Sequence, residues 1–187
     1  MANKDSAFGL RPIGKVGQNR DNQGLSEYDI AASATAIFQN DPVEMAATGT
    51  ITVAAATDTL LGSLTGVFFT DASTSKPTFA NHLKASNTAT DIKGFVSDDP
   101  YERFEIQSDD ATAAADVGLN ADIVYASGAT PNFVSKVELD HSDLKTATAQ
   151  LRVLGISKDI DNNEAGSANV NLVVMINEHF LKGTVGI

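Results

Sequence analysis

Short runs that alternate apolar and polar residues, separated by turn signals, are the feature that most constrains the fold of this chain. Arg103, Glu105 and Gln107 alternate with Phe104 and Ile106, as expected for a strand with one polar and one apolar face. Turn signals such as Asn40-Asp41-Pro42 interrupt these runs. No stretch carries apolar residues at i, i+3, i+4 and i+7 over three turns, which argues against a helical bundle.

We therefore predict an all-β fold, mainly β with one or two short helices, whose body is a β-barrel or a β-sandwich. The two expected helical segments are Ala111–Leu119 and Asp140–Leu144, and the polar stretch Asp71–Thr90 is expected to be a long surface loop. The strongest strands are expected at Ala149–Ile156 and Asn169–Asn177. The other nine candidates are Leu25–Ala31, Ala34–Gln39, Val43–Ala47, Thr50–Ala55, Leu64–Thr70, Lys93–Ser97, Arg103–Gln107, Asp122–Ala126 and Val134–Glu138.

Composition limits the classes of function. The 187 residues suffice for one domain with an extension, and the absence of cysteine excludes disulfides, thiolate metal sites and cysteine nucleophiles. A net charge of -11 argues against a nucleic-acid partner, because phosphate binding requires an excess of Lys and Arg. No secretory signal is expected at the N-terminus. Apolar runs are too short for a spanning helix, so no membrane partner is expected either.

The charge is divided unevenly along the chain. Residues 1–20 hold four basic residues against one acid, a net charge of +3, whereas the remainder carries -14. Phe8, Leu10, Pro12 and Val16 fall on even positions, as one face of an extended segment would. We predict an extended N-terminal arm over residues 1–24 and a single β-rich domain over residues 25–187. The arm either docks on an acidic surface, such as another copy of the body, or is a solvated tail.

The chain carries no complete catalytic or metal-binding motif. Asp159–Glu164 begins like a calcium loop but has Glu164 where an EF-hand requires glycine, so we expect a solvated connection between strands. His141-Ser142-Asp143 has the residue types of a hydrolase triad, yet adjacent residues do not point at one another in triad geometry. We expect no catalytic, cofactor-binding or metal-binding residues, no cofactor and no enzyme activity.

Paired carboxylates leave one enzymatic alternative open. Asp98 with Asp99, Glu102 with Glu105, and Asp109 with Asp110 could face a cleft in an acidic hydrolase. The plainer interpretation is a negative, soluble surface.

Several short segments, in order along the chain, form a pattern of motifs. The first is Ala7-Phe8-Gly9-Leu10-Arg11-Pro12, and the others are residues 36–43 (AIFQNDPV), 94–96 (GFV), 99–107 (DPYERFEIQ), 116–121 (DVGLNA), 151–155 (LRVLG) and 173–179 (VVMINEH). Together they resemble a family of small head proteins of tailed bacteriophages, and the first is similar to that family's FGLRP start. The segment 36–43 departs from the family pattern at Gln39-Asn40, where a glycine is expected before Asp-Pro.

The resemblance implies a structural virion protein, a capsid decoration (cement) protein on the outer surface of the capsid. Its partners would be the major capsid protein and other copies of itself, as a homotrimer, and it would be made in the host bacterial cytoplasm. It would stabilise the head against the pressure of packaged DNA. We expect Phe8, Leu10, Arg11, Pro12 and Ile13 of the arm to make the capsid or inter-subunit contacts. The alternative from a different class is a virion-associated host-surface or glycan-binding β module, disfavoured by the absence of tryptophan.

Overall fold

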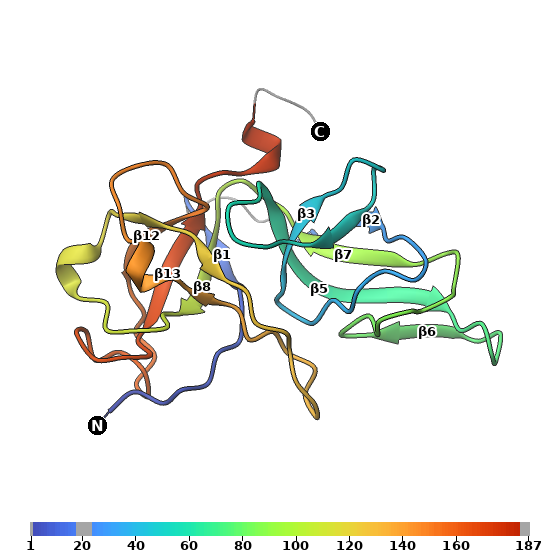
Figure 1. Ribbon diagram of the computed structural model, residues 1–187, viewed down its shortest axis with the longest axis horizontal. Helices are drawn as coiled ribbons and strands as arrows, with labels where there is room; N and C mark the ends of the chain where they lie inside the picture. Colours follow the sequence, from blue (N-terminus) through green and yellow to red (C-terminus); the bar gives the residue numbers. More distant parts are fainter. Residues whose placement is uncertain (1, 18–23, 184–187) are drawn as a thin grey trace.

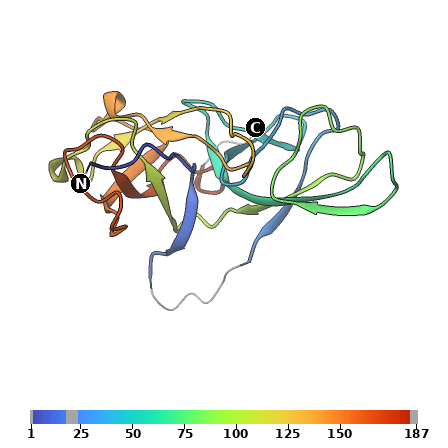
Figure 2. The ribbon, with the colours of Figure 1, turned by 90° about the horizontal axis from the view of Figure 1, so that it is seen from below.

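The computed structural model describes residues 2–17 and 24–183, and within them the chain is mainly β with antiparallel sheets. This confirms the predicted all-β class, and the antiparallel sheets are consistent with a β-sandwich body. Figure 1 shows an elongated molecule with β8, β12 and β13 at one end and β5, β6 and β7 at the other. Figure 2 shows the same two parts side by side along the long axis.

The first sheet has five strands in the order β1-β8-β13-β12-β9. Their bounds are Arg11–Lys15 for β1, Glu102–Gln107 for β8, Asn171–Ile176 for β13, Leu151–Ile156 for β12 and Asn120–Ala121 for β9. Phe104 and Ile106 of β8 alternate with Arg103, Glu105 and Gln107, so the predicted alternation holds along this strand. The apolar side faces the core.

The second sheet has six strands, of which five follow the order β2-β7-β5-β3-β4 and the sixth, β6, pairs with β5. Their bounds are Ser26–Asp29 for β2, Lys93–Ser97 for β7, Leu60–Thr70 for β5, Pro42–Met45 for β3, Ile51–Val53 for β4 and Pro77–Ala80 for β6. Val67 and Phe68 pair with β7 and also with β6, so β6 lies along the edge of β5 opposite to β7.

The remaining described elements are short. Strands β10 (Ile123–Val124) and β11 (Glu138–Leu139) form a two-stranded sheet. Three 3₁₀ helices, each of three residues, are η1 (Ala114–Asp116), η2 (His141–Asp143) and η3 (Phe180–Lys182). The first two lie within the predicted helical segments, and η3 was not predicted.

Two hydrophobic clusters of buried residues share β5. Leu60 packs with Phe104, Leu151 and Val174 in the first cluster, which lies against the first sheet. Its neighbour Leu61 packs with residues such as Leu83 and Val96 in the second cluster. Because successive side chains of a strand point to opposite sides, one strand contributes to both clusters.

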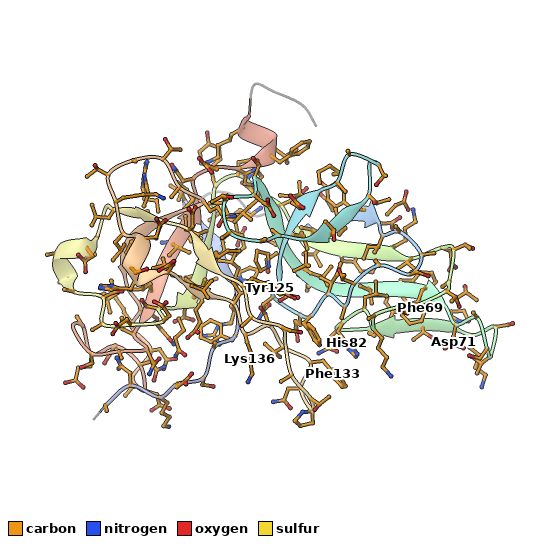
Figure 3. All side chains as sticks on the ribbon, viewed as in Figure 1. Phe69, Asp71, His82, Tyr125, Phe133 and Lys136 are labelled. Carbon is orange, nitrogen blue, oxygen red and sulfur yellow. The ribbon has the colours of Figure 1, made fainter. Side chains whose placement is uncertain are left out.

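A hairpin-like segment, residues 125–137, also connects the two parts. The Gln39 N–H donates to the Phe133 carbonyl at 3.2 Å, and the Ser135 N–H donates to the Gln39 carbonyl at 2.8 Å. The Phe133 ring stacks on the His82 imidazole with centroids 3.9 Å apart, and Figure 3 shows these two side chains together at the junction. This segment lies in the chain between β9 and β12 of the first sheet, and it contacts loops of the second sheet.

The predicted strand Val134–Glu138 is wrong in its bounds, because β11 covers only Glu138–Leu139. β1 and β9 were not among the predicted strands. The strand predictions also fail elsewhere. Asp71–Thr90 is not one long loop, because Pro77–Ala80 forms β6 on the edge of β5. Ala34–Gln39 is not a strand, although Ile37 and Gln39 form isolated bridges to Leu83 and Val134. In both cases the decisive partner lies on a distant segment whose position local alternation does not give.

Candidate functional site

The candidate site is the N-terminal segment, residues 2–16, which lies on the body of its own chain. Its last part is β1, which pairs antiparallel with β8 at the edge of the first sheet. The Leu10 N–H donates to the Asn40 carbonyl at 2.9 Å, and the Ser63 hydroxyl donates to the Leu10 carbonyl at 2.6 Å. Arg20, one of the basic residues of the predicted arm, lies outside the described residues.

The five predicted contact residues fall into three environments. Leu10 is fully buried in the first hydrophobic cluster. Phe8 and Pro12 are half-buried, and Arg11 is exposed but paired with Glu105. Ile13 is 47% exposed at the bulge between Pro12 and Gly14. Only the exposed parts of Phe8, Arg11, Pro12 and Ile13 are therefore available to another chain in this arrangement.

Arg11 forms a compact charged contact. Its guanidinium pairs with the buried Glu105 carboxylate, which also accepts a hydrogen bond from the Ser157 hydroxyl. The Arg11 Cζ atom lies 4.5 Å from the centroid of the Phe8 ring, in a cation–π arrangement. Removing Arg11 would leave a buried carboxylate without its cation, which costs more than the pair contributes.

A second set of contacts fixes the residues before Phe8. Gln107, fully buried, accepts a hydrogen bond from the Ser6 N–H at 2.9 Å and donates to the Lys4 carbonyl at 3.0 Å. Asn162 accepts from the Lys4 N–H at 2.8 Å and donates to the Lys4 carbonyl at 2.9 Å. Asn162 belongs to the stretch considered above as a calcium loop. It is buried rather than solvated, and it holds the N-terminal segment.

Gly9 is required where this segment passes the 38–41 turn. Its φ of +72° favours glycine, and a Cβ atom there would overlap the Asn40 carbonyl oxygen and the Ser135 side chain. Asn40 also has a positive φ, 65°, which asparagine tolerates better than most residues. The departure from the family pattern at Gln39-Asn40 therefore leaves a turn that positions the Asn40 carbonyl for Leu10.

Asp41 lies beneath this contact and is fully buried. Its Oδ2 accepts a hydrogen bond from the Phe38 N–H at 2.7 Å, whereas Oδ1 has no well-oriented hydrogen bond to the described residues. Burial raises the pKa of Asp41 to about 6, against the opposing effects of the Ser135 hydroxyl and the Phe38 N–H. Burial therefore disfavours the charged form of this carboxylate at neutral pH.

A surface hollow of about 480 Å³ lies beside β1. It is lined by residues of β1, including Ile13 and Lys15, and by Leu25 and Glu102. Burial raises the pKa of Glu102 above its ordinary value, and the positive charge of nearby Lys15 opposes part of this rise. Lys15 itself forms an ion pair with Asp99 at 2.9 Å. The hollow combines exposed apolar side chains with a mixed-charge rim, as contact surfaces do.

Two of the catalytic candidates are not assembled in the described residues. His141 Nδ1 lies 3.2 Å from the Thr112 hydroxyl, while Ser142 donates to Asp140, so the His-Ser-Asp run does not form a triad. Glu102 and Glu105 are three residues apart on β8 and therefore point to opposite faces of the sheet. No cluster of three His, Asp or Glu side chains suited to a metal ion occurs in residues 2–17 and 24–183.

Sequence reasoning missed two exposed sheet faces. Phe68, Phe79 and Phe95 cluster on the outer side of the second sheet, and Phe79 is 74% exposed. Arg103 and Arg152 lie on the outer side of the first sheet. Alternation within each strand could have placed these residues away from the core, but their grouping depends on strand order.

Comparisons with protein families, with curated proteins and with solved structures give no match. Among the described residues, no helix has the length and apolar character needed to cross a membrane.

Proposed function

We propose that this protein is a capsid decoration (cement) protein of a tailed-bacteriophage head. In this proposal it binds the outside of the major capsid protein lattice, associates with other copies of itself, as a homotrimer, and stabilises the head against DNA pressure. It performs no reaction and requires no cofactor.

The observation that carries the proposal is the convergence of the family-like segments around the N-terminal segment. Leu10 of the first segment hydrogen-bonds to Asn40 of the second, and Arg11 pairs with Glu105 of the segment DPYERFEIQ. Gln107, at the end of that segment, binds Ser6 and Lys4. Residues far apart in sequence that carry the resemblance therefore specify one structural feature, the docking of this segment on the body.

A load-sharing role is compatible with this architecture. β1 is an edge strand, and an edge strand offers unpaired backbone groups to a neighbouring chain. Ile13 and Val16, 47% and 46% exposed, provide apolar contact area next to this edge. Several such weak contacts in an oligomer add through effective concentration.

The test uses heads assembled with and without the chain. Heads carrying the protein should survive higher temperature or osmotic shock than heads lacking it. Ile13→Asp should lower occupancy on the head at least about tenfold, because a charge replaces an exposed apolar contact. The matched control is Ile160→Asp, since Ile160 is 87% exposed on another loop. Unchanged survival without the protein would contradict the cement role.

The glycan-binding alternative is favoured by one observation, the aromatic cluster of the exposed Phe79 with the partly buried Phe68 and Phe95. Aromatic faces can stack on sugar rings. This alternative requires binding to a glycan array that Phe79→Ala abolishes, and the decoration role requires none.

A further inference from the structure

The outer side of the first sheet carries a mixed basic and apolar surface, here called the arginine face. It consists of Arg103, Arg152, Leu154, Val173 and Met175. Met175 lies between the two arginines in register, paired with Arg152 on one side and Arg103 on the other. Both arginines and Leu154 are exposed, whereas the intervening residues of these strands point into the core.

The charge of the arginine face differs from that of the molecule. Neither Arg103 nor Arg152 forms an ion pair with any residue the structure describes, although Arg152 donates to the Asn120 side chain at 3.0 Å. The neighbouring Arg11 and Glu105 neutralise each other. A chain with a net charge of -11 thus exposes two unpaired cations between apolar side chains.

The outer side of the second sheet carries the opposite combination, here called the phenylalanine face. It consists of Phe68, Phe79, Phe95, Glu27, Asp29 and Lys93. The Phe68 and Phe79 rings have centroids 4.8 Å apart, and those of Phe79 and Phe95 are 6.1 Å apart. Glu27 and Asp29 share the single cation Lys93, which leaves an excess of negative charge.

These two faces belong to sheets at opposite ends of the elongated molecule (Figure 1). We propose that the arginine face of one copy of this chain docks on the phenylalanine face of a second copy. Arg103 and Arg152 then meet Glu27 and Asp29, and the phenylalanine rings, of which Phe79 is the most exposed, cover Leu154, Val173 and Met175. Guanidinium groups also bind well over aromatic rings, as Arg11 does over Phe8 within the chain.

Charge complementarity decides the symmetry of this contact. The arginine face cannot pair with itself, because two copies would bring like charges together in an apolar contact. The contact is therefore heterologous, head to tail, and repeats until it closes into a ring or extends as a chain. A nucleic-acid occupant fits less well, because the apolar residues between the arginines offer nothing to phosphate groups.

This contact between copies is a specific form of the self-association included in the proposed function, and its biological setting rests on that function. Its test uses only the purified full-length chain in solution. A failure here would therefore leave head binding and head survival to their own experiment, and the two failures can be told apart.

The experiment compares four proteins by analytical ultracentrifugation over a concentration series at low and high salt. They are the wild type, an arginine-face variant (Arg103→Glu with Arg152→Glu), a phenylalanine-face variant (Glu27→Lys with Asp29→Lys) and a control. The control, Lys84→Glu with Lys136→Glu, reverses two exposed charges that lie on neither face. Circular dichroism verifies folding, and Arg103→Gln with Arg152→Gln replaces the arginine-face variant if that variant fails to fold.

The wild type and the control should associate, and high salt should weaken the association. Each face variant alone should associate at least about tenfold more weakly. An equimolar mixture of the two face variants should regain association, because each contributes one intact face of a heterologous pair.

Three results would overturn the proposal. The wild type could remain monomeric at every concentration in low salt. One or both face variants could associate like the wild type. The mixture could also associate no better than its separate components, which would exclude the pairing of these two faces.

Discussion

At the scale of single residues, buried polar groups show how the chain is held in place. Glu105 and Gln107 are buried on the outer side of the first sheet, which sequence alternation alone would expose. They tolerate burial because Arg11, Ser6 and Lys4 of the N-terminal segment satisfy them. Asp41 differs, since one of its carboxylate oxygens has no well-oriented partner among the described residues.

Asp41 predicts a pH dependence of stability. Its pKa in the folded state is raised to about 6 from an ordinary value of 3.8, so the folded protein binds this proton more tightly. Its contribution to stability is therefore full below about pH 3.8 and is lost as the pH rises through about 6. The free energy of unfolding of the wild type, relative to Asp41→Asn, should fall by about 1.4 kcal/mol between about pH 5 and about pH 7.5.

Urea denaturation of both proteins at several pH values measures this difference. Burial lowers the pKa of His179 to about 4, so this residue contributes in the opposite direction. The stability that it gives the folded protein is fully present above about pH 6.5 and is lost as the pH falls through about 4. It is common to both proteins and cancels in the comparison. A difference that does not change with pH would show that Asp41 titrates normally.

At the scale of elements, the decisive feature is β1, which extends the first sheet of its own chain. Leu10, just before β1, is fully buried, whereas Ile13 within it is 47% exposed. The two residues belong to the same predicted contact set, yet the sheet gives them different roles. Leu10 anchors the segment in the core, and Ile13 remains available to a partner.

This difference predicts unequal effects of two matched substitutions on the isolated protein. Leu10→Ala should lower the free energy of unfolding by about 2–5 kcal/mol, because it leaves a cavity in a buried site. Ile13→Ala should change it by no more than about 0.5 kcal/mol, since the side chain is largely exposed. Urea denaturation measures both. Equal, small effects would mean that the segment is not docked on its own body in solution.

At the scale of the whole molecule, the two hydrophobic clusters are connected through the same segments of the chain. β5 supplies Leu60 to the first cluster and Leu61 to the second. The 125–137 segment and the Leu10–Asn40 hydrogen bond cross between the same two parts. Neither cluster can open without losing contacts that the other needs.

We therefore expect both parts to unfold in one cooperative transition. Hydrogen exchange followed by mass spectrometry should give peptides from β5 and β7 the same urea midpoint as peptides from β12 and β13. Leu10→Ala should lower both midpoints together. Two separate midpoints, or a shift confined to the first sheet, would show that the clusters are independent units.

Local sequence determined the all-β class and several strands, for local physical reasons. β8 alternates apolar and polar residues, as suits a sheet with one buried side, and β12 and β13 are rich in apolar and β-branched residues. The positions of all three strands are confirmed. β6 was missed because Pro77–Ala80 is only four residues long within a polar stretch, and it is held by pairing with β5. The contact residues remain a prediction, although their positions in the sheet are now defined.

The sequence by itself determined which residues favour strands and which side of each strand is apolar, because these depend on neighbours in the chain. Only the tertiary structure decided the strand order, the docking of Leu10 in the core and the pairing of Arg11 with Glu105. Arg11 and Glu105 are 94 residues apart, and no local pattern encodes such a contact. The same long-range order gathers single exposed side chains into an arginine face and a phenylalanine face, because register between strands determines which residues are neighbours.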